Sequence, residues 1–254
     1  MKREKFLFEN DEGQKLAALL EMPDNVRAFA LFAHGFTCGK DLKAASRIAR
    51  ILTQHGIAVL RFDFTGLGGS DGDFSNTNFS SNVADLRSAA AHLRDNFQAP
   101  SLLIGHSLGG SAILSVAGDI PEARAVVTIG SPGEISHVKR LFEDDLYAIE
   151  KLGAYPVRLA GRTFVIRQQL VDDIQQQKVA EKVFRMNKPL LVFHAPEDDT
   201  VLIEQAEHIF RSARHPKSFI SLHGADHLLS DNKDADYVGE CIVAWSSRYL
   251  DMTP

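Results

Sequence analysis

A serine stands at the centre of a glycine-rich segment, LLIGHSLGGSA, at residues 102–112. The apolar run Leu102 to Ile104 and the helix-forming residues after the glycines predict a strand, a sharp turn and a helix. Ser107 at the apex would hold its hydroxyl clear of the backbone as a nucleophile, and the small Gly105 and Gly109 leave room for that strained residue. The free N–H groups of the following helix suit the oxyanion of an acyl-transfer intermediate.

The pattern G-x-S-x-G is only moderately specific, because it arises by chance about once in a dozen chains of this length. A glycine-rich connection could also be purely structural, or could bind a phosphate. The phosphate alternative is weak here because the sequence has neither G-x-x-x-x-G-K-[ST] nor G-x-G-x-x-G. The rest of the chain must therefore decide.

A serine hydroxyl needs a base to remove its proton, and the base needs an acid to orient it. On this architecture the acid and then the histidine follow the serine along the chain, in loops after later strands. The loop after the predicted strand 218–222 reads HGADH, and its last residue, His227, is the predicted base. His223 is still close to the strand and is interpreted as structural, and Asp226 is too near His227 to orient it.

Three consecutive acids follow the predicted strand 189–194. The third or fourth position of such a turn points inward, which favours Asp198 as the acid of the triad. Asp199 or Thr200 would then cap the next helix, and Glu197 would be solvated. The sequence therefore predicts a catalytic triad of serine, aspartate and histidine.

An oxyanion hole requires two N–H donors. Leu108, directly after the nucleophile, supplies one. The loop after the predicted strand 27–33 begins His34-Gly35, where the backbone can turn and present the amide of Phe36 as the second.

A metal site is the rival interpretation, since several possible ligands follow neighbouring strands. It leaves the serine turn unexplained, and the sequence has no H-E-x-x-H pair, so we expect no metal and no cofactor. The possible ligands are His194, Asp198, Asp199, His223 and His227.

Composition is that of an ordinary globular protein, with 254 residues, 44% of them hydrophobic, and a net charge of −5. This balance gives no reason to expect nucleic acid or a membrane as partner, and the predicted partner is a small-molecule ester. The polar N-terminus and the lack of an 18-residue apolar run predict a soluble cytoplasmic protein. Cys241 is interpreted as a packed thiol and Cys38 as incidental. The oligomeric state stays open.

Strands and helices alternate along most of the sequence, which predicts an α/β fold with a mostly parallel sheet covered on both faces. A hairpin at 5–9 and 15–22 comes first. The clearest helix has apolar residues at helical spacing from Phe79 to Phe97, and an earlier helix, capped by Asp41, should end near Gly56. The remaining expected strands are 27–33, 56–62, 102–104, 123–130, 189–194 and 218–222, and the remaining helices are 202–213 and 234–249.

Residues 133–188 interrupt this alternation and form an insertion between two core segments, 1–132 and 189–254. The insertion should contain an amphipathic helix from Val138 to Ile149, a hairpin with Gly161 in its turn, and two short helices. Leaving the sheet near its carboxyl edge, it could be a lid over the ligand crevice. Alternatively, it covers an edge strand and has no role in substrate binding.

The sequence resembles the α/β-hydrolase superfamily in its HGF loop, in RFDFTGLGGSDG, in GHSLGG and in GADH. More closely, LFAHGFTCGKDLKAASRIAR, FSSNVADL and ARHPKSFISLHGADHLL resemble the hydrolase half of bacterial proteins that join an α/β-hydrolase to an OsmC-like domain. The superfamily's nucleophile, acid and base fall on Ser107, Asp198 and His227. Gly35 and Gly69 depart from the cysteine and acidic residue often found there. The resemblance stops before the OsmC-like half, so it implies hydrolysis and no peroxide reduction.

We therefore expect a serine hydrolase, a carboxylesterase that cleaves small apolar acyl esters through an acyl-enzyme. Amide, thioester or carbon–carbon bond hydrolysis on the same triad are the nearest alternatives. A different class of function, a catalytically idle binding or partner module, also stays open.

Overall fold

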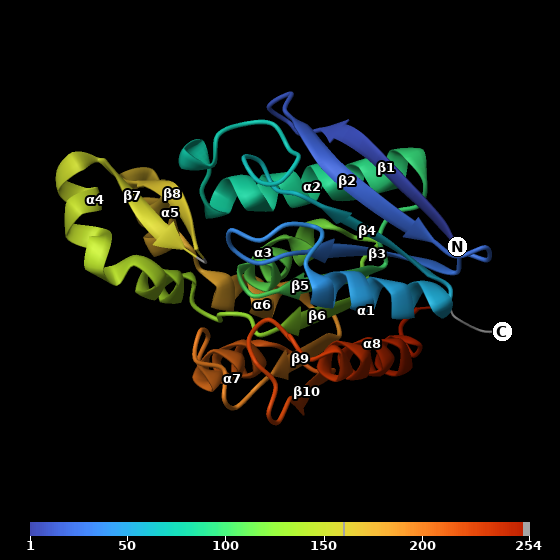
Figure 1. The fold of residues 1–254 in the computed structure, drawn as a ribbon. Helices are drawn as coiled ribbons and strands as arrows, with labels where there is room; N and C mark the ends of the chain where they lie inside the picture. The colour runs from blue at the N-terminus through green and yellow to red at the C-terminus, as the bar shows by residue number, and fades with distance from the viewer. Residues whose placement is uncertain (160, 251–254) are drawn as a thin grey trace.

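The computed structural model describes residues 1–159 and 161–250, which form a central eight-stranded sheet with helices on both sides (Figure 1). The strand order is β1-β2-β4-β3-β5-β6-β9-β10. β1 and β2 pair antiparallel to each other, β2 pairs antiparallel with β4, and all later neighbours are parallel. The strands are β1 Lys2–Glu9, β2 Lys15–Met22, β3 Ala28–Ala33, β4 Ile57–Phe62, β5 Leu102–His106, β6 Ala125–Ile129, β9 Leu190–His194 and β10 Lys217–Ser221.

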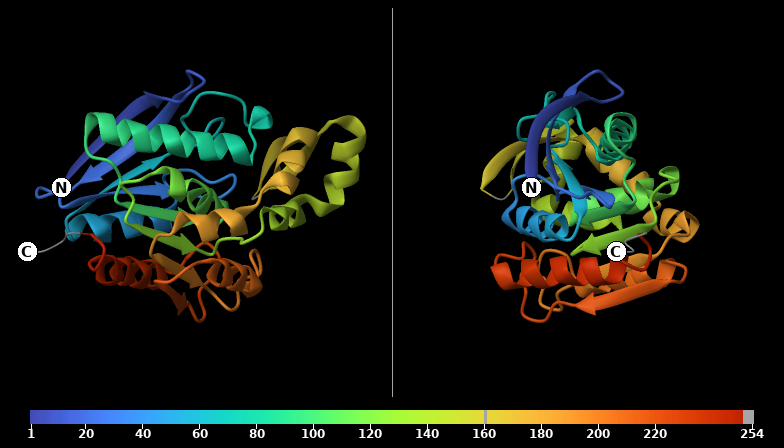
Figure 2. Two further views of the ribbon diagram at one scale, coloured as in Figure 1. Left: turned by 180° about the vertical axis from the view of Figure 1, so that it is seen from behind. Right: turned by 90° about the vertical axis from the view of Figure 1, so that its right-hand side faces the viewer.

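The sheet separates two hydrophobic cores because successive side chains of a strand point to opposite faces. In β3, Phe29 and Leu31 belong to one core, and Ala30 and Phe32 belong to the other. Helices α2, α3, α6 and α7 pack on the first face and α1 and α8 on the second (Figure 2). The predicted α/β fold class is confirmed. These helices are α1 Lys43–Gln54, α2 Phe79–Asn96, α3 Leu108–Val116, α6 Val179–Met186, α7 Ile203–Ser212 and α8 Asn232–Ser246.

Helix α2 has the predicted bounds, and its cap explains where it begins. The Asn78 side chain accepts a hydrogen bond from the Ser81 N–H at 2.8 Å, and the Ser81 hydroxyl accepts one from the Asn78 N–H at 3.0 Å. This reciprocal pair satisfies two helix-end donors.

The predicted cap of helix α1 is wrong. The helix begins one residue later than a cap at Asp41 would allow, with Leu42 at the N-cap position and no side-chain cap. Leu42 packs against the core, so apolar burial decides where the helix begins, while Asp41 is exposed and lies 3.7 Å from the Lys40 ammonium. The expected end is confirmed, since Gly56 has a φ of +86° directly after the C-cap.

Residues 135–176 of the insertion project from one end of the core, on the side away from the N-terminus, whereas α6 packs on the first face of the sheet (Figures 1 and 2). The expected single amphipathic helix is wrong: a 3₁₀ segment, Ile135–Asp145, has a kink at Phe142 and is followed by α4, Leu146–Leu152. The buried Phe142 adopts non-helical dihedrals, so packing breaks the helix that the spacing indicated.

The predicted hairpin of the insertion is confirmed as antiparallel β7, Ala154–Leu159, and β8, Arg162–Arg167, although turn residue 160 lies outside the described residues. The two short helices are α5, Gln168–Gln176, and α6.

Contacts with the segment between β4 and α2, and with the first turn of α2, hold the insertion to the core. Phe164 of β8 lies against Phe74, with ring centroids 4.7 Å apart. Asp173 of α5 accepts hydrogen bonds from the Ser80 N–H at 2.9 Å and from its hydroxyl at 2.5 Å. Apolar and charge-assisted contacts therefore join the two parts.

Among residues 1–159 and 161–250, no helix combines the length and the apolar character needed to cross a bilayer.

We expect Asn78→Ala to lower the free energy of unfolding by about 1 kcal/mol, because it removes the side-chain half of the capping pair. Asp41→Ala is the matched control and should change that free energy by less than about 0.5 kcal/mol, since its side chain caps no helix. Urea denaturation of both variants measures the two effects. Equal losses would contradict the cap assignments.

Candidate active site

Ser107 occupies the sharp turn between β5 and α3, at φ 54° and ψ −132°. A non-glycine residue at positive φ is strained, at a cost of order 1–3 kcal/mol, and persists only where its surroundings hold it. The Ser107 N–H donates to the Ile129 carbonyl at 2.9 Å, and the Ser107 carbonyl accepts from the Gly110 N–H at 2.9 Å. These two bonds fix the turn between β6 and the first turn of α3.

Glycines make this turn possible, as the sequence predicted for two of them. A Cβ at Gly105 would overlap with the backbone of Gly110, and a Cβ at Gly109 would overlap with the carbonyl of His34. Gly35 has the same role on the other side, since its Cβ would lie 2.9 Å from the Cβ of Ser107. Three backbone segments therefore meet around the serine more closely than side chains would permit.

The three side chains expected to converge lie within hydrogen-bond distance of one another. Nε2 of His227 is 3.0 Å from Oγ of Ser107, and Nδ1 of His227 is 2.8 Å from Oδ2 of Asp198. Because a carboxylate only accepts, Nδ1 carries the proton and Nε2 is free to accept the serine proton. The Asp198 side chain is 1% exposed and that of His227 10% exposed.

The turn after β9 holds Asp198 by its own main chain. Oδ1 of Asp198 accepts from the N–H groups of Thr200 at 3.0 Å and Val201 at 2.8 Å, which leaves Oδ2 for His227. The expected cap at Asp199 or Thr200 is wrong, because Leu202 is the N-cap residue of α7 and no side chain caps that helix.

Burial works to raise the pKa of the Asp198 carboxyl, but hydrogen bonds from His227 and Val201 outweigh it and lower the pKa. Asp198 is therefore ionised at neutral pH and favours a proton on Nδ1 of His227.

The loop after β3 lies directly against the nucleophile turn, as the positions of Gly35 and Gly109 require. Leu108 is the first residue of α3, where a helix leaves N–H groups without an intrahelical acceptor. Within the described part of the chain, the Phe36 amide also donates to no protein acceptor. Both predicted oxyanion donors are therefore available to a ligand.

Asp63, which follows β4, binds the loop after β3, the loop that carries the Phe36 amide and is called the oxyanion loop below. Its carboxylate accepts from the Lys40 amide at 2.7 Å, the Lys40 ammonium at 2.6 Å and the Gly69 amide at 3.0 Å. Burial acts to raise the pKa of the Asp63 carboxyl, but these bonds and the Lys40 charge outweigh it and lower the pKa. The sequence analysis did not single out Asp63, although its loop carried part of the family resemblance.

Three further histidines surround the triad, and the sequence analysis gave none of them this role. Nε2 of His106 lies 2.7 Å from the carbonyl of His227. In the acid loop, Nε2 of His194 lies 2.7 Å from the Val201 carbonyl, and Nε2 of His137, from the insertion, lies 3.0 Å from the Thr200 carbonyl. The only available signal was that His106 is part of the motif and that His194 ends its strand.

Other candidates lie outside this arrangement. His223 is exposed and its Nδ1 lies 3.1 Å from the Glu197 carboxylate, which is itself exposed to solvent as predicted. Cys38 is partly buried, and burial raises the pKa of its thiol, which opposes a reactive thiolate. Among residues 1–159 and 161–250, no three His, Cys, Asp or Glu side chains are grouped so as to hold a metal ion.

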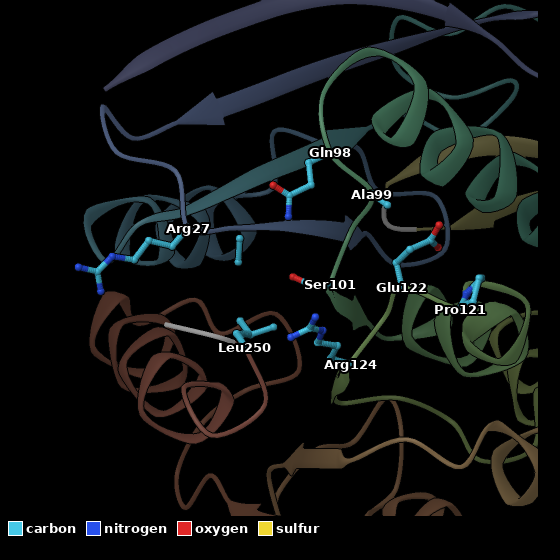
Figure 3. A pocket seen from close by; sticks show the side chains of 9 residues that line it. Arg27, Gln98, Ala99, Ser101, Pro121, Glu122, Arg124 and Leu250 are labelled. Carbon is cyan, nitrogen blue, oxygen red and sulfur yellow. The ribbon is translucent and has the colours of Figure 1, made fainter. Parts of the chain in front are cut away.

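A cavity of about 410 Å³ lies elsewhere (Figure 3). Its lining includes Arg27, Ser101 and Arg124, which precede β3, β5 and β6. The cavity is therefore at the amino ends of the parallel strands, opposite the Ser107 turn, and is separate from the candidate site.

A family model described as "Serine aminopeptidase, S33" matches residues 24–152. The matched segment contains Phe36 and Ser107, whereas Asp198 and His227 lie beyond it.

Solved structures resemble the whole chain. The esterase domain of a Rhodothermus marinus protein is 44% identical, with a TM-score of 0.80, and the match covers 98% of this chain and 100% of that one. The protein Est1E from Butyrivibrio proteoclasticus, with ferulic acid bound, is 20% identical, with a TM-score of 0.82, over 97% of this chain and 99% of that one. At that lower identity the likeness concerns the fold alone.

Among curated proteins, the mitochondrial palmitoyl-protein thioesterase ABHD10 of Rattus norvegicus is 32% identical over 100 residues, which are 39% of this chain and 32% of that protein. The chain spans from 32% to 64% of the length of the curated relatives it matches. The closer resemblance to hydrolases fused to OsmC-like domains stays a prediction.

Asp63→Asn should lower the free energy of unfolding at neutral pH by about 2 kcal/mol, since it removes a buried charged acceptor. The folded-state pKa of Asp63 is depressed, so its contribution is complete above the unfolded value of about 3.9 and is lost as pH falls through the folded value. Denaturation curves at decreasing pH should show native protein and variant converging in acid. Asp71→Asn, an exposed change in the same loop, controls for general effects of acid, and a pH-independent gap for Asp63→Asn would contradict the assignment.

Proposed function

Since this chain belongs to the serine aminopeptidase S33 family of α/β hydrolases, we propose that it is a serine hydrolase that cleaves carboxylic esters. The observation that supports this proposal most strongly is the pair of hydrogen bonds that connects Ser107 Oγ through His227 to Asp198. A buried carboxylate, an imidazole and the hydroxyl of a partly buried serine, in that order, are the groups that acyl transfer needs.

In the first half of the proposed reaction, Oγ of Ser107 attacks the ester carbonyl carbon while Nε2 of His227 takes the hydroxyl proton. Asp198 stabilises the imidazolium through the Nδ1–H bond. The carbonyl oxygen becomes an oxyanion that accepts from the Phe36 and Leu108 amides, each donor being worth roughly 3–4 kcal/mol of transition-state stabilisation. The carbon–oxygen bond then breaks, and the alcohol leaves with the proton from His227.

In the second half, a water molecule attacks the acyl-serine carbonyl and gives its proton to His227. The same two amides stabilise the second oxyanion. When this intermediate collapses, the carboxylic acid is released and the proton returns to Oγ of Ser107. Hydrogen, oxygen and charge balance without any cofactor.

Two observations bear on the bond that is cleaved. The 44% identity to an esterase domain over nearly the whole chain favours oxygen esters. We propose that the acyl group is small and apolar. The name of the rat relative, a palmitoyl-protein thioesterase, favours thioesters as the second candidate. Both use the same nucleophile and oxyanion donors, so a thioester alternative changes the leaving group only.

We further propose that residues 133–188 are a cap that forms one wall of the acyl site. Two contacts support this role. Phe164 of the hairpin is joined through Phe74 to Phe36 of the oxyanion loop, with centroid distances of 4.7 and 5.6 Å. His137 bonds to the Thr200 carbonyl, so the same segment also reaches the acid loop.

Ser107→Ala should lower turnover of p-nitrophenyl esters by about 10⁶-fold with the fold intact, because the remaining groups cannot form an acyl-enzyme. Ser115→Ala, at a buried serine in α3, the helix that follows Ser107, is the control and should keep wild-type turnover. A fluorophosphonate probe should label native protein and Ser115→Ala and leave Ser107→Ala unlabelled.

Turnover of the Ser107→Ala variant near the native rate would contradict the proposal, and an unlabelled, inactive native protein would favour a binding module. The same assay with acyl thioesters and anilides separates the thioester and amide alternatives from the ester.

Phe164→Ala should raise KM roughly tenfold for esters of longer acyl chains and much less for acetyl esters, because it removes apolar surface from the proposed wall. Val165→Ala is the matched control, since its side chain is 43% exposed on the other face of the same strand. Steady-state kinetics over a series of acyl lengths makes the comparison. Equal KM changes for short and long chains would remove the cap from the acyl site.

A further inference from the structure

His106 lies between Gly105 and the nucleophile, and its ring is buried at 2% exposure. Nε2 of His106 is 2.7 Å from the main-chain carbonyl oxygen of His227. A carbonyl oxygen only accepts, so Nε2 carries the proton and donates it to that carbonyl. Nδ1 of His106 is buried and has no hydrogen-bond partner within the described residues.

The same ring also faces the oxyanion loop. A Cβ built on Gly35 would lie 3.4 Å from Nδ1 of His106, which is an ordinary contact distance. The ring is thus packed between the loop that carries the Phe36 amide and the loop that carries His227. Its centroid lies 5.1 Å from the centroid of the His227 ring.

The loop that carries His227 has few other hydrogen bonds that could connect it to β5, the strand that leads to Ser107. In the described part of the chain, its other main-chain bonds are internal, or they reach β9 and the turn after it. The internal bonds run from Ala225 to Leu222 and from Leu229 and Ser230 to Asp226, and the others run from Leu222 to the His194 carbonyl and from Gly224 to Glu197. None of these bonds involves β5. The His106 side chain therefore connects the end of β5, next to Ser107, to the main chain of His227.

We propose that His106 is a positioning residue, whose Nε2–H bond to the His227 carbonyl sets the base at hydrogen-bond distance from Ser107. It touches neither substrate nor the reacting atoms. The inference rests on the proposed hydrolase function, in which His106 acts indirectly by holding the main chain of His227.

Burial lowers the pKa of His106 to about 4, and the neighbouring His227 charge adds to this effect. The ring is therefore neutral at the pH where a triad works. It can donate from Nε2 without adding a second positive charge beside the imidazolium that forms on His227.

Two amide substitutions test the bond directly. The side-chain amide nitrogen of His106→Gln reaches the place of Nε2, whereas that of His106→Asn reaches only the place of Nδ1. We expect His106→Gln to keep kcat within about tenfold of native protein, and His106→Asn to lose roughly 100-fold in kcat with little change in KM, as misplaced catalytic groups do. The rate of fluorophosphonate labelling should fall in parallel with kcat.

His106→Leu removes the donor altogether and should match His106→Asn, while His92→Leu, a partly buried histidine that stacks on Phe6, should leave kcat unchanged. Thermal unfolding of each variant identifies any that does not fold. If the leucine variant fails to fold, the comparison of glutamine with asparagine still decides.

The inference is overturned if the asparagine variant keeps native kcat, or if the glutamine variant is impaired as strongly as the asparagine variant. The two ideas fail in different ways. Native protein that is neither active nor labelled removes the hydrolase function, whereas active, labelled native protein with an equally active His106→Asn variant removes only the role of His106.

Discussion

Crowding of main-chain atoms around Ser107 is the constraint on which the rest of this site depends. The turn holds a non-glycine residue at positive φ, which is stable only if neighbouring backbone packs directly against it. Gly35, Gly105 and Gly109 permit this approach because each lacks a Cβ that would collide. The same closeness places the Phe36 and Leu108 amides beside the turn, so under the proposed function a single packing requirement would produce both the strained nucleophile and its oxyanion donors.

Two neutral histidine rings, His106 and His194, hold the loops that carry His227 and Asp198. Burial lowers the pKa of His106 and of His194, and each ring donates through Nε2 to a carbonyl of a triad loop. Buried charge is costly unless it is paired, so neutral donors can fix these loops at a smaller electrostatic cost than lysine or arginine. The Asp198 carboxylate then faces His227 in surroundings that contain hydrogen bonds and little competing charge.

The alternation of strands and helices, and the three side chains that converge, could be predicted because they leave local marks in the sequence. Apolar strands followed by turn residues show where the carboxyl end of a parallel sheet must be. The failures concern choices made by tertiary packing. The partly buried Leu42, which packs against the core, occupies the N-cap position of α1, and Phe142 breaks a helix that its spacing indicated. His106 and Asp63 were missed because their partners lie far away in the chain, where no local pattern records them.

The site is drawn from the loops that follow β3, β5, β9 and β10, and β10 is both the last strand in the chain and an edge of the sheet. A contiguous fragment that contains all of these groups must reach from Phe36 to His227. Contacts between residues so far apart in the chain form slowly, because the chain loses entropy in closing large loops before these contacts can stabilise it. The loop that carries His227 is synthesised after β10. A nascent chain that still lacks β10 and this loop would therefore not react with an active-site probe. Probe reactivity would thus time the final docking event of folding.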